Sequence, residues 1–147
     1  MMLCSACLLG VCCRYDAESK PHQGVVSLLG REIVIPVCPE QWGGLPTPRL
    51  PSEIQGRRVV AQDGTDVTQA FQRGAQEVLK MARLMGIKKA LLKQRSPSCG
   101  CGQVYDGSFS GKIISGDGVT AFLLKSSGIE IWTEESFPFP PDSSRAY

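Results

Sequence analysis

Histidine is nearly absent from this chain, and no long apolar run occurs in it. His22 is the only histidine among the 147 residues. Zinc sites built from two cysteines and two histidines are therefore excluded, and a Cys-His catalytic dyad could use only that residue. No apolar stretch is long enough to span a bilayer, and residues 1–9 are too short and uncharged for a signal peptide. We therefore expect a cytoplasmic protein that does not associate with a membrane.

Clustered positive charge is also scarce. The formal net charge is +2, and the longest basic runs are the dipeptides Arg57-Arg58 and Lys88-Lys89. Nucleic-acid binding usually requires a broad basic face, so tRNA is an unfavourable partner, whereas small neutral or anionic ligands remain open. The length and the 42% hydrophobic content suit one globular domain with a sizeable core.

Cysteine, by contrast, is abundant. The chain has seven cysteines. An odd number without a secretory signal argues against a disulfide framework. Cysteine-only metal binding, thiol chemistry and buried unreactive thiols remain as explanations.

Strand-like and helix-like segments alternate along the sequence. Strands are expected at residues 2–5, 32–37, 89–93 and 129–132, and helices at 25–29, 67–85 and 119–127. The β-branched run in 32–37 predicts a strand buried on both faces. Residues 58–68 look irregular or weakly extended, and residues 105–118 look rich in turns.

This alternation predicts an α/β protein, a single-domain Rossmann-like three-layer fold with a small, mostly parallel sheet. Residues 1–147 would form one catalytic domain, in which about 133–147 are a proline-rich surface tail.

Three cysteines follow predicted strands, namely Cys7, Cys38 and Cys99. The carboxyl ends of parallel strands meet at one edge of a sheet, so these thiols should converge there. Convergent thiols without histidine suit zinc or an iron-sulfur cluster, although spacing alone equally allows unliganded thiols. The C-x-x-C pattern at residues 4–7 is a poor redox motif, because Cys4 lies inside a strand and not at a helix start.

Polar residues beside these cysteines are candidates for chemistry. Glu40 is either a solvated loop carboxylate or a general acid/base beside the metal. Ser96 and Ser98 could hydrogen-bond within their turn or donate to a ligand. Lys93 and Arg95 are either surface charges or binders of an anionic group.

Four sequence blocks resemble the thiouracil desulfidase, or 4-thiouridine desulfurase, family (TudS), formerly a bacterial domain of unknown function. The resemblance runs over about residues 3–132. The blocks are SACLLG at 5–10 with CRYD at 13–16, CPEQWGGLPTPR at 38–49, SPSCG at 96–100, and YDG at 105–107 with GDGVT at 116–120.

The resemblance implies a 4Fe-4S cluster that is held by three cysteines, so that one iron is open to the substrate sulfur. It also implies non-redox desulfuration of 4-thiouracil, 2-thiouracil or 4-thiouridine monophosphate to the uracil form plus sulfide, with no electron-transfer partner. The family's cysteines match Cys7, Cys13, Cys38 and Cys99. We select Cys7, Cys38 and Cys99 as ligands because each follows a strand, and Cys13 is the reserve candidate.

In the same resemblance, Glu40 would activate water or carry the ring proton, and Ser96 would orient the pyrimidine. Ser98, Lys93 and Trp42 would bind substrate, and residues 42–51 would wall its pocket. Two other functions remain open, a cysteine-only metal sensor without turnover and a sulfur-transfer enzyme that forms a persulfide on Cys99 or Cys101. Oligomeric state, the choice between 2-thio and 4-thio compounds and the choice between base and nucleotide are all undecided.

Overall fold

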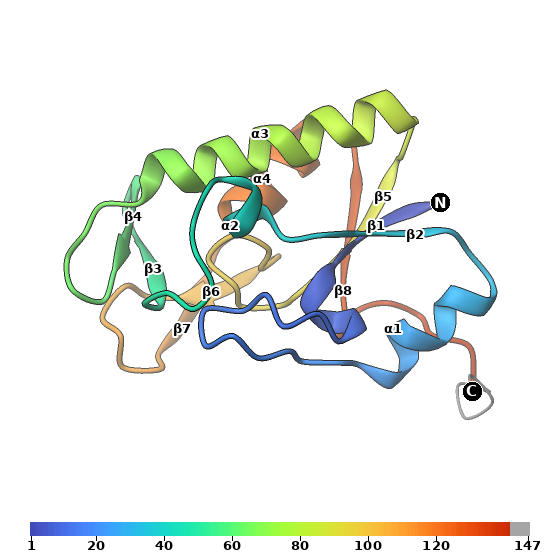
Figure 1. The fold of residues 1–147 in the computed structure, drawn as a ribbon, viewed down its shortest axis with the longest axis horizontal. Helices are drawn as coiled ribbons and strands as arrows, with labels where there is room; N and C mark the ends of the chain where they lie inside the picture. The colour runs from blue at the N-terminus through green and yellow to red at the C-terminus, as the bar shows by residue number, and fades with distance from the viewer. Residues whose placement is uncertain (142–147) are drawn as a thin grey trace.

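The computed structural model describes residues 1–141, and its centre is a four-stranded parallel sheet (Figure 1). The sheet order is β2-β1-β5-β8, and all neighbouring strands run parallel. The expected strands are confirmed with boundaries within two residues: β1 (Met2–Ser5), β2 (Val34–Val37), β5 (Lys89–Leu92) and β8 (Glu130–Thr133). The chain leaves β1 for β2 on one side and later adds β5 on the other, so a topological switch point lies between β1 and β5.

Helices cover both faces of this sheet. α3 (Thr68–Met85) and α4 (Val119–Ser126) pack on one face, where Val78 and Leu124 share a core with Leu3 of β1. The other face is covered by α1 (Gln23–Ser27) and the 3-10 turns η1 (Ala6–Leu9) and η2 (Leu28–Gly30) (Figure 1). Met2 and Cys4 alternate with Leu3 along β1 and enter this second core. The predicted three-layer α/β fold is confirmed.

The period of α3 matches most of its expected core face. Phe71, Ala75, Val78 and Ala82 are buried, whereas Met85 at the end of the helix is exposed. The helix stops at Gly86, which adopts a left-handed φ of 66°.

Two small antiparallel sheets replace segments that looked irregular or turn-rich. One pairs β3 (Ser52–Gln55) with β4 (Arg58–Ala61), and the other pairs β6 (Gln103–Tyr105) with β7 (Ile113–Ser115). Each of these strands is only three or four residues long. The weakly extended character expected at 58–68 is met by β4, and β7 lies within the turn-rich segment 105–118, but neither antiparallel pairing was predicted.

The expected burial of β2 on both faces was also wrong. β2 is an edge strand, in which Val34 and Ile35 are half-buried and Pro36 is exposed. Proline has no N–H to donate, so it is tolerated at a sheet edge and not in a central strand.

Part of the segment expected to be a surface tail packs on the molecule. Phe137 and Phe139 are half-buried against the second core, and the Phe139 ring stacks on His22 with 5.1 Å between centroids. Residues 142–147 of the expected tail lie outside the described residues. Within residues 1–141, no helix combines the length and the apolar character needed to cross a membrane.

Candidate active site

A cavity of about 580 Å³ opens at the carboxyl ends of β1, β2 and β5. This is the switch-point edge where ligands bind in open parallel sheets. The cavity brings together eight of the residues selected from the sequence: Cys7, Cys13, Cys38, Glu40, Lys93, Ser96, Ser98 and Cys99. Trp42 is the exception, because it is exposed at the end of α2 (Pro39–Trp42) and lies outside the cavity lining.

Three of the cysteine thiols meet on one side of the cavity. Cys7 lies in η1 directly after β1, and Cys38 is the residue at which α2 begins, directly after β2. Cys13 lies in the loop after η1, where its thiol is close enough to those of Cys7 and Cys38 for both to influence its pKa. Cys38 Sγ donates to the Cys13 carbonyl oxygen at 3.7 Å. Cys13 therefore lies close to two of the three expected ligands.

These contacts change the acidity of the thiols. The hydrogen bond with Cys13, together with burial, raises the pKa of Cys38 well above its usual value. For Cys13, the hydrogen bond with Cys38 lowers the pKa, but the hydrogen bond with Cys7 and burial raise it to about 11 overall. The thiols of Cys13 and Cys38 are thus protonated without a ligand, and binding iron as a thiolate releases the proton.

Cys99 supplies a fourth thiol from the other side of the switch point. It lies in the turn after β5, it is 4% exposed, and its thiol hydrogen-bonds with Ser5 and Ser98. Burial raises the pKa of Cys99 to about 12, although both hydrogen bonds oppose the change. Within residues 1–141, no three His, Cys, Asp or Glu side chains are arranged around a point where a single metal ion would fit. A polynuclear iron-sulfur cluster makes a different demand, because each thiolate binds its own iron.

Glu40 is held in the first turn of α2 by an ion pair with Arg49. Pro39 occupies the first position of this helix, where its fixed φ suits the start of a helix. Arg49 Nε donates to Glu40 Oε2 at 2.7 Å, and Arg49 Nη2 contacts the same oxygen. The Glu40 carboxylate is therefore oriented and largely shielded from solvent, with its side chain 15% exposed.

Ser96 and Ser98 play different parts in the turn that carries Cys99. Ser96 Oγ accepts the backbone N–H groups of Ser98 at 3.1 Å and Cys99 at 3.0 Å. Its own hydroxyl proton is not used in these bonds and could be donated to a ligand. The Ser98 hydroxyl is buried and shares a 2.7 Å hydrogen bond with Thr120 of α4. Ser98 thus anchors the turn to α4.

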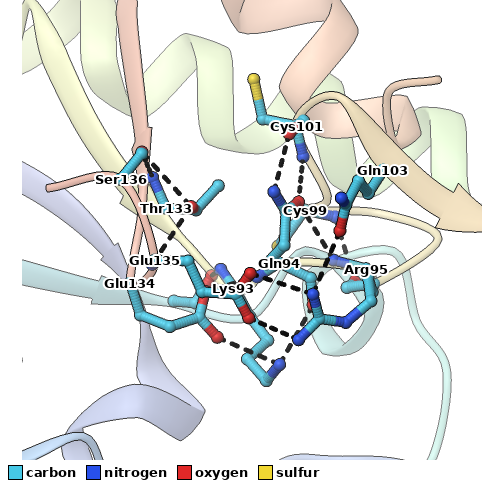
Figure 2. A network of polar contacts seen from close by, with 12 residues as sticks. Lys93, Gln94, Arg95, Cys99, Cys101, Gln103, Thr133, Glu134, Glu135 and Ser136 are labelled. Atoms are coloured by element: carbon cyan, nitrogen blue, oxygen red, sulfur yellow. Dashed lines mark hydrogen bonds and ion pairs between the residues drawn. The ribbon is translucent and has the colours of Figure 1, made fainter. Parts of the chain in front are cut away.

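A polar network fixes the segment after β5, as Figure 2 shows. Lys93 Nζ lies 3.1 Å from Glu134 Oε2, and the Lys93 backbone N–H donates to Ser5 Oγ at 2.9 Å. The side chain of Gln94 both donates to the carbonyl and accepts the N–H of Cys101, each at 2.9 Å. These bonds close the loop that holds Ser96 and Cys99, because they join its two ends.

The sequence suggested no role for Gln94 or Glu134, and for Arg49 only a place in the pocket wall. Arg49 stands in a block that carried the family resemblance, but its partners lie at positions 13, 40, 46 and 47, which form no recognisable spacing. Glu134 lies in the expected surface tail and reaches Lys93 only through the parallel pairing of β5 with β8. Of the pocket wall expected at 42–51, Arg49 and Pro51 line the cavity.

Comparison with known proteins agrees with this geometry. Residues 2–136 match the model of the 2-thiouracil desulfurase family. The chain is 39% identical over 144 residues to the uncharacterized protein YbbK of Bacillus subtilis (strain 168), covering 91% of this chain and 95% of YbbK. It is also similar to the solved structure of a 4Fe-4S-dependent thiouracil desulfidase, TudS, with a TM-score of 0.89 and 45% identity, covering 93% of this chain and 92% of TudS. The chain therefore belongs to the 2-thiouracil desulfurase family.

Proposed function

We propose that this protein removes sulfur from thiolated uracil compounds by adding water, giving the uracil form and sulfide, with a 4Fe-4S cluster as cofactor. The carrying observation is that four thiols, Glu40 and Ser96 all line one cavity at the switch point. Membership of the family supports the reaction. The similar TudS structure is that of a 4Fe-4S-dependent enzyme, which supports the cofactor.

The donor set suits such a cluster. We assign Cys7, Cys38 and Cys99 as ligands because they reach the cavity from three separate strand ends. Cys13, which lies close to two of them, is the alternative donor. When bound, the cluster would supply a thiophilic Lewis acid for the exocyclic sulfur of the substrate.

Glu40 and Ser96 would handle water and substrate. Arg49 binds Oε2 of Glu40, so Oε1 is the oxygen that we assign to the proton of the attacking water. As the C–O bond forms and the C–S bond breaks, Glu40 returns that proton to the ring nitrogen or the departing sulfur. The free hydroxyl proton of Ser96 would bind a carbonyl oxygen or ring nitrogen and so orient the pyrimidine.

We propose a nucleotide rather than a bare base as the substrate, because of the charges around the cavity. Five cations line it, of which Arg49, Lys93 and Arg95 are paired with Glu40, Glu134 and Glu135. Arg14 is also paired, because its Nε lies 3.4 Å from Asp16 Oδ1. Within residues 1–141, no carboxylate pairs with Lys20, whose backbone N–H bonds to the Cys7 carbonyl at 3.0 Å. We assign Lys20 to the phosphate of a substrate such as 4-thiouridine monophosphate.

The substrate assignment is tested by comparing sulfide release from 4-thiouracil and from 4-thiouridine monophosphate after anaerobic cluster reconstitution. Lys20→Ala should raise KM about tenfold for the monophosphate and leave KM for the base unchanged, as expected for one lost charge-assisted contact. Lys80→Ala is the matched control, because Lys80 is exposed on α3 and paired with Glu77. Equal KM changes for both substrates would contradict the phosphate site.

The cluster-loaded protein also distinguishes a desulfidase from the two other functions, a metal sensor and a sulfur-transfer enzyme that forms a persulfide. A metal sensor would release no sulfide, and Glu40→Gln would not alter its behaviour. A persulfide on Cys101 is disfavoured because Cys101 lies outside the cavity lining, and Figure 2 shows its sulfur pointing away from the network.

All seven cysteines are free, and none forms a disulfide. This state suits the reducing cytoplasm, where we place the protein.

A further inference from the structure

We propose that Arg49 is a positioning residue that fixes the Glu40 carboxylate relative to the cysteine-bearing loop after η1. This inference rests on the proposed function, in which Glu40 accepts the proton of the attacking water. Arg49 would act through Glu40, with no need to touch the substrate. It would therefore control the rate of the chemical step more than substrate binding.

The guanidinium of Arg49 joins three separate segments. Nε and Nη2 contact Oε2 of Glu40 in α2. Nη2 also donates to the Cys13 carbonyl at 3.0 Å. Nη1 donates to the Pro46 carbonyl at 3.1 Å and to Thr47 Oγ1 at 3.0 Å. The side chain is 8% exposed, so these bonds face little competition from water.

The backbone of Arg49 strengthens the connection to the first loop. Its N–H donates to the Tyr15 carbonyl at 2.8 Å. The Cys13 carbonyl, which accepts from Arg49, also accepts from Cys38 Sγ at 3.7 Å. The bond from Cys38 exists only while Cys38 is a thiol, so in the cluster-loaded protein the bonds of Arg49 are the ones left on this carbonyl. A displacement of Arg49 would therefore release Glu40 from the first loop.

Glu40 needs this external support because its own helix is short. α2 has only four residues, Pro39–Trp42, so the helix itself does little to fix a side chain on its first turn. The planar fork of an arginine can bond to a carboxylate, a carbonyl and a hydroxyl simultaneously. Lysine would keep the charge but has a single nitrogen, so it could not reproduce the fork.

The decisive experiment is a double-mutant cycle on the cluster-loaded full chain, with Arg49→Lys and Glu40→Gln measured singly and together. Arg49→Lys should lower kcat on the order of 100-fold, as expected for a misplaced catalytic group. KM should stay within about threefold, because substrate binding is not lost. In the Glu40→Gln background, the same Arg49→Lys change should cost less than about twofold, since it has no base left to position.

Two further measurements distinguish positioning from folding. Iron per chain should be equal in wild type and Arg49→Lys, and added guanidinium, below unfolding concentrations, should partly restore kcat in Arg49→Ala. Arg83→Lys is the matched control, because Arg83 is exposed in the last turn of α3. If Arg49→Lys lowers kcat by the same factor in the wild-type and Glu40→Gln backgrounds of an active enzyme, the positioning role of Arg49 is overturned but the proposed function is not. A wild-type protein that releases no sulfide would overturn the proposed function and this inference with it.

Discussion

Gly43 at the end of α2 and Gly74 within α3 face each other where the two helices cross. A Cβ atom on Gly43 would stand 1.9 Å from the Ala70 carbonyl oxygen. A Cβ atom on Gly74 would likewise stand 1.9 Å from the Pro39 carbonyl oxygen. No side chain fits at either position, so the backbones touch directly. This crossing places the proposed ligand Cys38 and the proposed base Glu40, because both belong to the first turn of α2.

Gly74→Ala is therefore expected to destabilise the protein, although the same change in an ordinary helix stabilises it by about 1 kcal/mol. The new methyl group would push α2 away from α3, and overpacking of this kind costs about 1–3 kcal/mol. Denaturant unfolding measures the loss, and sulfide release should fall with it because Glu40 moves.

Gly30→Ala is the matched control for this change. A Cβ atom on Gly30 would meet nothing within 4 Å, and its φ is not left-handed. Its unfolding free energy and turnover should match those of the wild type. A Gly74→Ala protein that is as stable as Gly30→Ala would show that the close crossing of α2 and α3 is not formed.

The assignment of Cys7, Cys38 and Cys99 as ligands predicts which cysteine variants of the protein lose iron and which keep it. Cys7→Ser, Cys38→Ser and Cys99→Ser should each bind less iron after reconstitution, because a soft thiolate is replaced by a hard hydroxyl. Cys12→Ser should keep its iron, since Cys12 is exposed and lies outside the cavity lining. Iron analysis per chain and the visible absorption spectrum give the readout.

Cys13→Ser decides between the two possible ligand sets. Iron retained by this variant supports Cys7, Cys38 and Cys99. A loss as large as that in Cys7→Ser, with iron retained in Cys99→Ser, would replace Cys99 by Cys13.

Ser96→Ala and Ser98→Ala should both lower stability, but only Ser96→Ala should also lower turnover. Ser96→Ala removes both the acceptor for two buried-turn N–H groups and the proposed substrate donor, so stability should fall by about 1–2 kcal/mol together with turnover. Ser98→Ala removes the bond to Thr120, so stability should fall by about 1 kcal/mol while KM and kcat stay near wild type. A large rise in KM for Ser98→Ala would make Ser98 a substrate-binding residue after all.

The bonds of the Asp117 carboxylate should make the stability of the folded protein depend on pH. Its carboxylate accepts the Gly102 N–H at 2.8 Å and pairs with Lys125 Nζ at 2.9 Å, which joins the loop after Cys99 to α4. Burial opposes the charged form, but the hydrogen bonds from Lys125 and Gly102 prevail and lower the pKa of Asp117 below its usual value. The carboxylate therefore stabilises the folded state above the unfolded-state pKa, and this contribution is lost as pH falls through the folded-state pKa.

Asp117→Asn should accordingly lower the unfolding free energy by about 1 kcal/mol at neutral pH. The difference from wild type should shrink below about pH 4, where the unfolded-state carboxyl protonates. Glu77→Gln, which breaks the exposed pair with Lys80, should change stability little at any pH. A difference in unfolding free energy between wild type and Asp117→Asn that stays constant down to pH 3 would contradict this role of the Asp117 carboxylate.

The sequence predicted those parts of the fold that depend on local patterns. The four main strands were predictable because they are short apolar runs, and α3 because its apolar residues repeat with a helical period and a glycine ends it. β3 and β6 could not be predicted, because each is stabilised by a partner and by contacts elsewhere. For example, Glu53 of β3 accepts the Gly107 N–H at 3.0 Å across the chain. The edge position of β2 was equally hidden, since it depends on strand order.

The site was predictable where chain topology decides it. Placing a cysteine after three of the four parallel strands was enough to gather Cys7, Cys38 and Cys99 around one cavity. The sequence could not show that Trp42 lies outside the cavity, because this depends on which residues of α2 face it: Pro39 and Glu40 line the cavity, whereas Trp42 is exposed. The contacts of Arg49 were missed for a similar reason, as its partners come from segments that only the folded chain brings together.

The role of the cluster is tested by anaerobic reconstitution of the full chain, followed by iron, cluster-sulfide and product analysis. We expect a brown protein with about four irons and four cluster sulfides per chain. It should release one sulfide per uracil-type product from 4-thiouracil or 4-thiouridine monophosphate, without added reductant. A colourless, iron-free protein that turns over equally well would contradict the proposed role of the cluster.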